Sequence, residues 1–418
     1  MTLVNRINAV VFLLAILVLG ECKIYAEEIT FAAKVVKLSA LAETEQEKYA
    51  RGLDELVATD MDGTLRYLLD SKPGTMNSGT RHGVNMPTNI DCALAASFLK
   101  RAAGKQREQL LLGIIESPNY AKRLSFPYLF SSPSYFSEPS SAGIEIANFC
   151  KEYLDNHTVN NDVAFSLFSF LLGGHKFDYQ SANSSLGKWV KKLANTRSDI
   201  YAYYANQIIA VHCPLTPDLS AAILQAMRPG EPKSYAEIGT VWGTWWRLGG
   251  NMFAMRNKVK IDASRALSAD ILPEITKVVA DSPDWLFNMV TPSMEADPAM
   301  ETNPGPWIVG YLGVLQRDTP EGKKLIDVFV QKAQLHQVMQ LMRESSNFIP
   351  PDEFNVYCTR ACQRLANKEY TDLMTLGCAI AFAKCYLQHP KLSDADKAAN
   401  RHLLEQALGL APAEKNDK

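Results

Sequence analysis

The sequence predicts an all-α protein, built as an irregular array of helical hairpins that is either solenoid-like or a bundle. Helix-start signals support this: Thr216-Pro217 and Thr319-Pro320 each place a capping hydroxyl before a proline in the first helical turn. No stretch shows the sustained apolar–polar alternation, enriched in β-branched residues, that half-buried strands require. The chain also shows no internal repeat of fixed period, so no named repeat family is indicated.

Apolar periodicity places individual helices along the chain. Residues 42–57 and 89–101 carry apolar side chains at helical spacing among charged ones. Residues 163–172 are apolar on nearly every side, follow a polar Asn-Asn-Asp start and stop at two glycines, a pattern typical of a buried helix. After Thr319, apolar residues form one helical stripe that continues to Met342.

Two long loops are expected in the N-terminal third. Residues 72–88 are rich in Gly, Ser, Asn and Pro, and residues 125–142 mix Pro and Ser with five aromatic side chains. Loops of this length are uncommon inside compact domains. The aromatic residues of the second loop predict that it packs onto the end of the helical array.

The first 26 residues resemble a secretory signal peptide. Arg6 precedes a short apolar run, Ala9 to Leu19, and Ala26 is a suitable last residue before cleavage. The run is too short to cross a bilayer, which takes about 20 residues, so no integral membrane segment is expected after cleavage. We therefore expect an exported protein, periplasmic or secreted, with an N-terminal helical region at 27–142 and a main helical domain at 143–418.

The composition and net charge limit the classes of partner that the chain can be expected to bind. The chain is 47% hydrophobic and 21% charged, which is ordinary for a globular protein with a full core. Its formal net charge is −2 and it has no long basic run, so nothing in its electrostatics favours nucleic acid or an anionic membrane. The expected partner is a protein or peptide whose identity the sequence does not specify.

The four C-terminal cysteines suggest two disulfide bonds. Residues 350–389 form a predicted helical hairpin, with Cys358 and Cys362 on one face of its first helix and Cys378 and Cys385 on one face of its second. In an antiparallel hairpin, the pairs Cys358–Cys385 and Cys362–Cys378 fit a single register. Export favours disulfides there, because secreted proteins meet an oxidising environment.

Other states of these four cysteines stay open: they could be buried free thiols that pack as small apolar groups, or a zinc site, for which spacings of four and seven are unusual. The pairing of Cys92, Cys150 and Cys213 is not predicted, and seven cysteines beyond the leader leave at least one unpaired within the chain.

One short motif suggests an enzyme. Asp60-Met61-Asp62-Gly63-Thr64 resembles the first motif of the haloacid dehalogenase superfamily of phosphatases. That resemblance implies Asp60 as nucleophile, Asp62 as general acid/base and a magnesium ion beside them. The family also needs a buried strand directly before the first aspartate, whereas the residues before Asp60 here end an amphipathic helix. The other interpretation is a polar turn between two helices.

Three tryptophans share one predicted helix face. Trp242, Trp245 and Trp246 stand at i, i+3 and i+4. If buried, they form a packing layer, which the neighbouring glycines favour; if exposed, they form a platform for sugar rings or a partner's apolar groups.

The leading expectation is therefore an exported, non-enzymatic helical protein that binds or scaffolds a protein or peptide and needs no cofactor. The alternative is an exported hydrolase, specifically a phosphatase using Asp60 and Asp62 with magnesium.

Overall fold

The computed structural model describes the chain in segments, and all structural statements concern these. They are residues 31–38, 45–70, 80–81, 84–85, 89–130, 141–173, 185–195, 200–230, 233–260, 266–292, 303–367 and 373–408. The leader lies outside them, as do most of the first expected loop and residues 131–140 of the second. The described residues are overwhelmingly helical, which confirms the predicted all-α class.

Contacts divide the chain into two compact units. One comprises Met1–Phe177 with Ala296–Met300, and the other comprises Asp178–Glu295 with Glu301–Lys418. The boundary expected at residues 142 and 143 falls inside a helix of the first unit.

The first unit is a stack of helices in two layers. After a helix at 31–38, one layer contains α2 (Gln46–Thr59), α4 (Asn89–Arg101), α6 (Tyr120–Phe130) and α8 (Asn161–Gly173), and each packs on the next. The other layer contains α3 (Met61–Asp70), α5 (Gly104–Ile115) and α7 (Ser141–Asn156). Two-residue strands β1 (Thr80–Arg81) and β2 (Val84–Asn85) pair antiparallel, Thr80 opposite Asn85.

The second expected loop is partly helical. Residues 125–130 are the C-terminal half of α6, even though Pro127 lies within it. The reason is packing: Phe126 and Phe130 are four residues apart, both are buried, and the Phe126 ring lies 6.0 Å from that of Phe170 in α8. Phe126 and Phe130 thus belong to the core between neighbouring helices.

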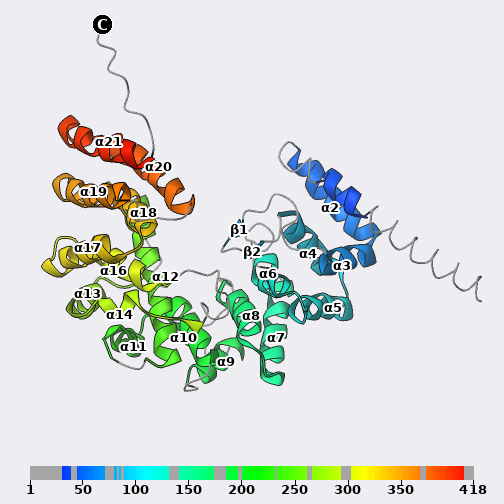
Figure 1. Ribbon diagram of the computed structural model, residues 1–418. Coiled ribbons are helices and arrows are strands. Elements are labelled where there is room, and N and C mark those ends of the chain that lie inside the picture. Colours follow the sequence, from blue (N-terminus) through cyan, green and yellow to red (C-terminus); the bar gives the residue numbers. More distant parts are fainter. Residues whose placement is uncertain are drawn as a thin grey trace, which may run out of the picture. The chain divides into compact units, whose positions relative to one another are not determined.

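The second unit also has two layers (Figure 1). Following α9 (Ser185–Ala194), layer A contains α10 (Ile200–His212), α12 (Tyr235–Asn257), α16 (Gly305–Leu315), α18 (Leu335–Ser345) and α20 (Leu373–Leu387). Layer B contains α11 (Pro217–Met227), α13 (Ile271–Asp281), α17 (Pro320–Lys332), α19 (Pro351–Ala366) and α21 (Asp394–Leu408), with the short α14 (Asp284–Phe287) before α16. Within each layer, successive helices are in contact. This order of contacts is that of a helical solenoid.

The two predicted helix starts are confirmed. The Thr216 hydroxyl accepts from the amide of Leu219 at the start of α11, and that of Thr319 accepts from the amide of Gly322 at the start of α17. The α8 helix is buried on nearly all sides, as its composition predicted. These cases follow from local sequence, because a cap needs only residues within one turn.

Candidate functional site

The three tryptophans lie on α12, a 23-residue helix of layer A, and the structure places none of them in the buried core. Trp242 and Trp245 are partly exposed, and 46% of Trp246 is exposed. The packing-layer interpretation is therefore wrong for Trp246. Neighbours in layer A flank α12 on two sides and layer B lies on a third, so these rings occupy its remaining side, toward solvent.

The glycines of α12 have the role that the packing interpretation gave them, because they allow close packing on α10 along the flank next to the tryptophans. Gly243 packs on α10: a Cβ atom there would lie 2.9 Å from the carbonyl oxygen of Gln207. Gly239 lies still closer to the backbone of Tyr203. Close backbone contact with α10 thus fixes the rotation of α12, and this rotation presents the tryptophans to solvent.

The indole rings form one cluster. Ring centroids are 5.1 Å apart for Trp242 and Trp245, 5.8 Å for Trp242 and Trp246, and 5.7 Å for Trp245 and Trp246. The planes of these pairs are inclined at 80°, 40° and 62°. The rings are therefore not coplanar, and a flat stacking platform for successive sugar rings is absent. Inclined rings instead form a ridged apolar surface that suits a partner's side chains.

Two further aromatic residues extend this surface. Phe253 is 61% exposed and stands seven residues after Trp246 on α12. Tyr311 of α16 is partly exposed, and its ring lies 4.0 Å from the position of a Cβ atom on Gly249. We call Trp242, Trp245, Trp246, Phe253 and Tyr311 the aromatic face. Sequence reasoning missed Phe253, although its spacing of seven continues the same helical stripe, and missed Tyr311 because its helix lies far along the chain.

A buried donor within the aromatic face lacks an acceptor. The indole nitrogen of Trp245 is inaccessible to solvent and makes no hydrogen bond with the described residues. Leaving such a donor unpaired costs about 1–3 kcal/mol. Unpaired buried groups are rare in folded proteins.

Asp60 and Asp62 lie where two helices meet. Asp60 follows α2, and its carboxylate Oδ1 accepts from the amide of Gly63 at 2.8 Å, while its carbonyl accepts from the Thr64 hydroxyl at 2.7 Å. Asp62 is in the first turn of α3. Helix α2 occupies the position where the phosphatase resemblance requires a strand. The pair thus has the geometry of a helix start, with acidic groups near the positive end of α3.

No disulfide connects the seven described cysteines, which are Cys92, Cys150, Cys213, Cys358, Cys362, Cys378 and Cys385. The predicted bonds Cys358–Cys385 and Cys362–Cys378 are not formed. The two helices are present as predicted, but α19 packs chiefly on α21 and α20 on α18. Burial raises the pKa of the Cys358 thiol well above its usual value, with Cys362 and Cys385 adding to the effect.

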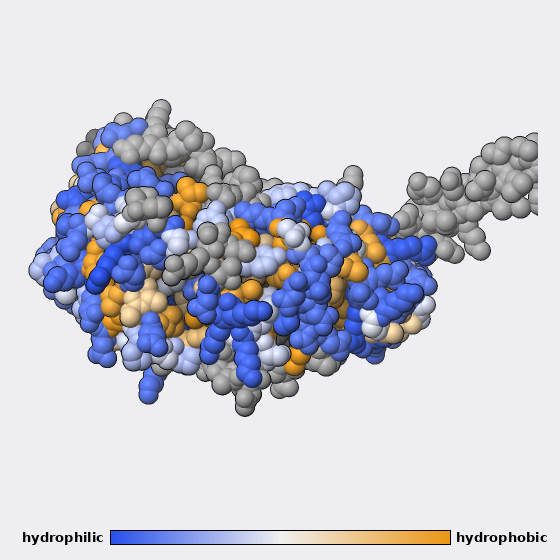
Figure 2. Space-filling view, turned by 90° about the horizontal axis from the view of Figure 1, so that it is seen from below, coloured by the Kyte–Doolittle hydropathy of each residue, from blue (hydrophilic) through white to orange (hydrophobic). Residues whose placement is uncertain are grey.

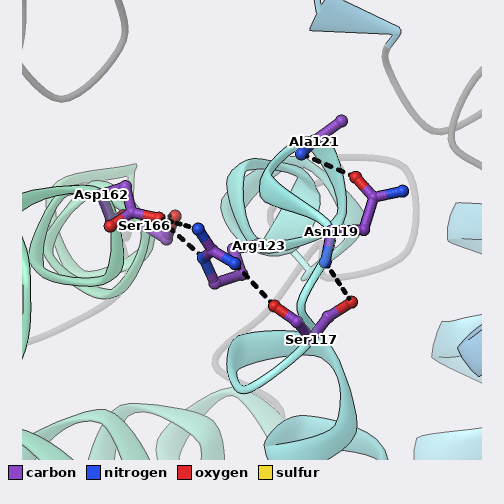
Figure 3. Close-up of polar contacts among 6 residues, drawn as sticks. All are labelled: Ser117, Asn119, Ala121, Arg123, Asp162 and Ser166. Carbon is purple, nitrogen blue, oxygen red and sulfur yellow. Dashed lines mark hydrogen bonds and ion pairs between the residues drawn. The ribbon is translucent and has the colours of Figure 1, made fainter.

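A partly buried ion pair joins α6 and α8 in the first unit (Figure 3). Arg123 of α6 binds the Asp162 carboxylate through Nε and Nη2, each at 2.6 Å, and its Nη1 donates to the carbonyl of Ser117 at 2.6 Å. Asn119 caps the start of α6 by accepting from the amide of Ala121. The Ser166 hydroxyl donates to the backbone carbonyl of Asp162. Every group is engaged, so the cluster joins α5, α6 and α8 and is not a reactive centre.

A shallow cavity of about 310 Å³ lies between α5 and α7. Leu99, Leu111 and Phe149 form its apolar wall, and Arg107 and Glu145 form an ion pair at its rim. No Ser, Thr, Cys, His or Lys side chain lines it. In the part of the chain that the structure describes, no three His, Cys, Asp or Glu side chains are grouped to hold a metal ion.

No family model, no curated protein and no solved structure matched the chain. None of the described helices combines the length and apolar composition needed to cross a bilayer. On the surface shown in Figure 2, apolar residues form small separate patches among hydrophilic ones.

Proposed function

We propose that this protein is an exported, non-enzymatic helical scaffold that binds a protein or peptide through the aromatic face. The observation that carries the proposal is the exposure of Trp246 and Phe253 on the free side of layer A. Aromatic side chains dominate the energetics of protein interfaces, where tryptophan and tyrosine are enriched. Large apolar side chains exposed together, on a helix whose rotation is fixed by close packing on a neighbouring helix, are typical of such a surface.

The repeated layers support the same proposal. In stacked helical hairpins, each layer forms an extended surface, and partners bind along one of them. Because layer A continues from α12 through α16, α18 and α20, a bound segment has room to extend beyond the aromatic face.

Site-specific photocrosslinking tests the proposed surface. A photoreactive phenylalanine analogue at Phe253 is compared with the same analogue at Val356, which is 48% exposed on α19 of layer B. In the protein's native compartment, we expect a discrete crosslinked product from position 253 and none from position 356. Equal labelling at both positions, or no product from position 253 in folded protein, contradicts the proposal.

Export rests on the leader and has its own test. Signal-peptide cleavage after Ala26 gives a mature chain that begins at Glu27. Intact-mass measurement and N-terminal sequencing of protein from the host should find this terminus. A retained leader in the cytosolic fraction would contradict the export part of the proposal and leave the crosslinking result unaffected.

A further inference from the structure

The surface beside the aromatic face carries positive charge at one end. Arg256, Lys258 and Lys260 stand three, five and seven residues after Phe253, and all three side chains are exposed. None of them forms an ion pair with another described residue. At the opposite end of α12, Lys233 and Glu237 pair with each other, so the charge there is balanced.

A further cation reaches the same end from α16. The Arg317 guanidinium lies 3.9 Å from the sulfur of Met255, which places it beside the last turn of α12. Its neighbour Asp318 lies 3.9 Å from Arg317 Nη2 and offsets part of this charge. Among the described residues, the end of α12 still has an excess of positive charge, which we call the cationic end: Arg256, Lys258, Lys260 and Arg317.

Helix stability does not account for all of these cations. A basic residue in the last turn complements the helix dipole, which suffices for Arg256. Lys258 is the C-cap residue, in the left-handed region at φ 53°, and Lys260 lies beyond the helix. Neither the cap geometry nor the dipole requires a lysine at 258, where glycine or asparagine is the usual residue.

We propose that the occupant of the aromatic face is an apolar–acidic peptide segment of a partner protein, with its carboxylates at the cationic end of α12. The inference rests on the proposed function and names the chemistry of its ligand. Apolar side chains contact the inclined indole rings, and Asp or Glu residues meet the cations, so charge complementarity sets the direction in which the segment lies. From Trp242 to Lys258 the surface extends about 24 Å, at 1.5 Å per helical residue, which matches about seven residues of extended chain.

An anionic membrane is the competing ligand, because aromatic and basic groups also bind lipid surfaces. The observations favour a peptide. Trp242 and Trp245 are held half-buried against their neighbours, so only Trp246 and Phe253 protrude, and the chain as a whole has a net charge of −2. Membrane binding is therefore an outcome that the experiment must be able to reveal.

The test uses three fluorescein-labelled 12-residue peptides with the same Leu and Phe residues and four Glu, four Gln or four Lys. Fluorescence polarisation with the full mature chain should show the Glu peptide binding at least about tenfold more tightly than the Gln peptide, and the Lys peptide weakest. Raising the salt from 50 to 500 mM should reduce this preference.

Matched variants locate the effect. Trp246→Ala should weaken binding of all three peptides at least about tenfold with an unchanged circular dichroism spectrum. The double variant Arg256→Glu/Lys260→Glu should invert the charge preference, while Lys324→Glu, an exposed cation of layer B, should leave it unchanged.

Two outcomes of the peptide measurement overturn the inference: no binding of any peptide, or equal binding of the Glu and Lys peptides. A third is cosedimentation of the same chain with vesicles containing phosphatidylserine when no peptide binds. In each of these cases, crosslinking at Phe253 still tests the proposed function separately, because it depends on the native partner and not on the charge of a chosen peptide.

Discussion

Gly239 of α12 packs directly on the backbone of Tyr203 in α10. A Cβ atom at position 239 would overlap the carbonyl oxygen of Tyr203 and lie 2.9 Å from its carbonyl carbon. Backbone cannot move aside as a flexible side chain can, so this contact fixes the spacing of the two helices. It also sets the rotation that exposes Trp246.

Replacing this glycine should destabilise the second unit. We expect Gly239→Ala to lower the free energy of unfolding by about 1–3 kcal/mol, because α10 and α12 must separate. Gly377→Ala on α20 is the matched control: no atom lies within 4 Å of its added methyl group, and better helix propensity should stabilise by up to about 1 kcal/mol. Urea denaturation measures both, and equal effects would contradict the close-contact account.

A buried arginine, Arg247, donates hydrogen bonds to backbone carbonyls at the end of α10. Pro214 has no N–H to donate to the carbonyl of Ala210 four residues earlier, and Arg247 Nε donates to that carbonyl instead. Its other nitrogens donate to the carbonyls of Cys213 and, at 3.2 Å, Ala266. We expect Arg247→Met to lower the free energy of unfolding by about 2–4 kcal/mol, since it leaves buried carbonyls unpaired.

Two further variants, Arg247→Lys and Arg364→Met, should have smaller effects than Arg247→Met. Arg247→Lys should recover only part of the stability, because an ammonium group lacks the planar fork that reaches several carbonyls. Arg364 donates in the same way to Val330 and Ala333 at the end of α17, but it is partly exposed, so water can replace it. Arg364→Met should therefore cost less than Arg247→Met in the same thermal unfolding measurement.

Lys122 should give the first unit a distinctive pH dependence. Its ammonium donates to the carbonyl of Leu68, and burial lowers its pKa from 10.5 to about 8, while Asp91 and Asp70 act in the opposite direction. Between pH 8 and 10.5 the unfolded chain then holds a proton that the folded chain has released, so the contribution of Lys122 to stability rises with pH.

The measurement is the difference in unfolding free energy between the wild type and Lys122→Met as a function of pH. This difference should move in favour of the wild type from pH 8 to 10.5, by up to about 1.4 kcal/mol per pH unit. Comparing the two proteins removes the contributions of cysteines and tyrosines, which titrate in the same range. A difference that stays constant over this range would show that Lys122 keeps its usual pKa.

The C-terminal cysteines should be reduced. Cys358 and Cys362 are buried, and burial raises the pKa of Cys362 to about 12, which suppresses the thiolate that begins disulfide exchange. Mass spectrometry of unreduced, unfolded protein should therefore find seven free thiols, with Cys378 and Cys385 labelled first in the folded state. Disulfide-linked peptides containing Cys358 and Cys385 would instead support the disulfide bonds that the sequence suggested.

The sequence by itself determined the features that depend on neighbouring residues, namely the helix starts and the all-α class. Thr216 and Thr319 cap helices because a hydroxyl, a proline and the amides they serve lie within one turn, and the all-α class follows from many such local signals. The helix–turn–helix at Asp60 is a local case too, since the carboxylate caps the helix that follows it.

Tertiary structure decided everything that depends on which helices become neighbours. It presented Trp246 to solvent, because Gly239 and Gly243 pack closely on α10 and fix the rotation of α12; it added Tyr311 from α16; and it packed α19 chiefly on α21 and α20 chiefly on α18. Helical periodicity defines which side chains share a face but contains no information about what covers that face. For this protein, the spacing of the tryptophans was therefore readable from the chain, and their exposure was set by backbone contacts of α12 with α10, another layer A helix.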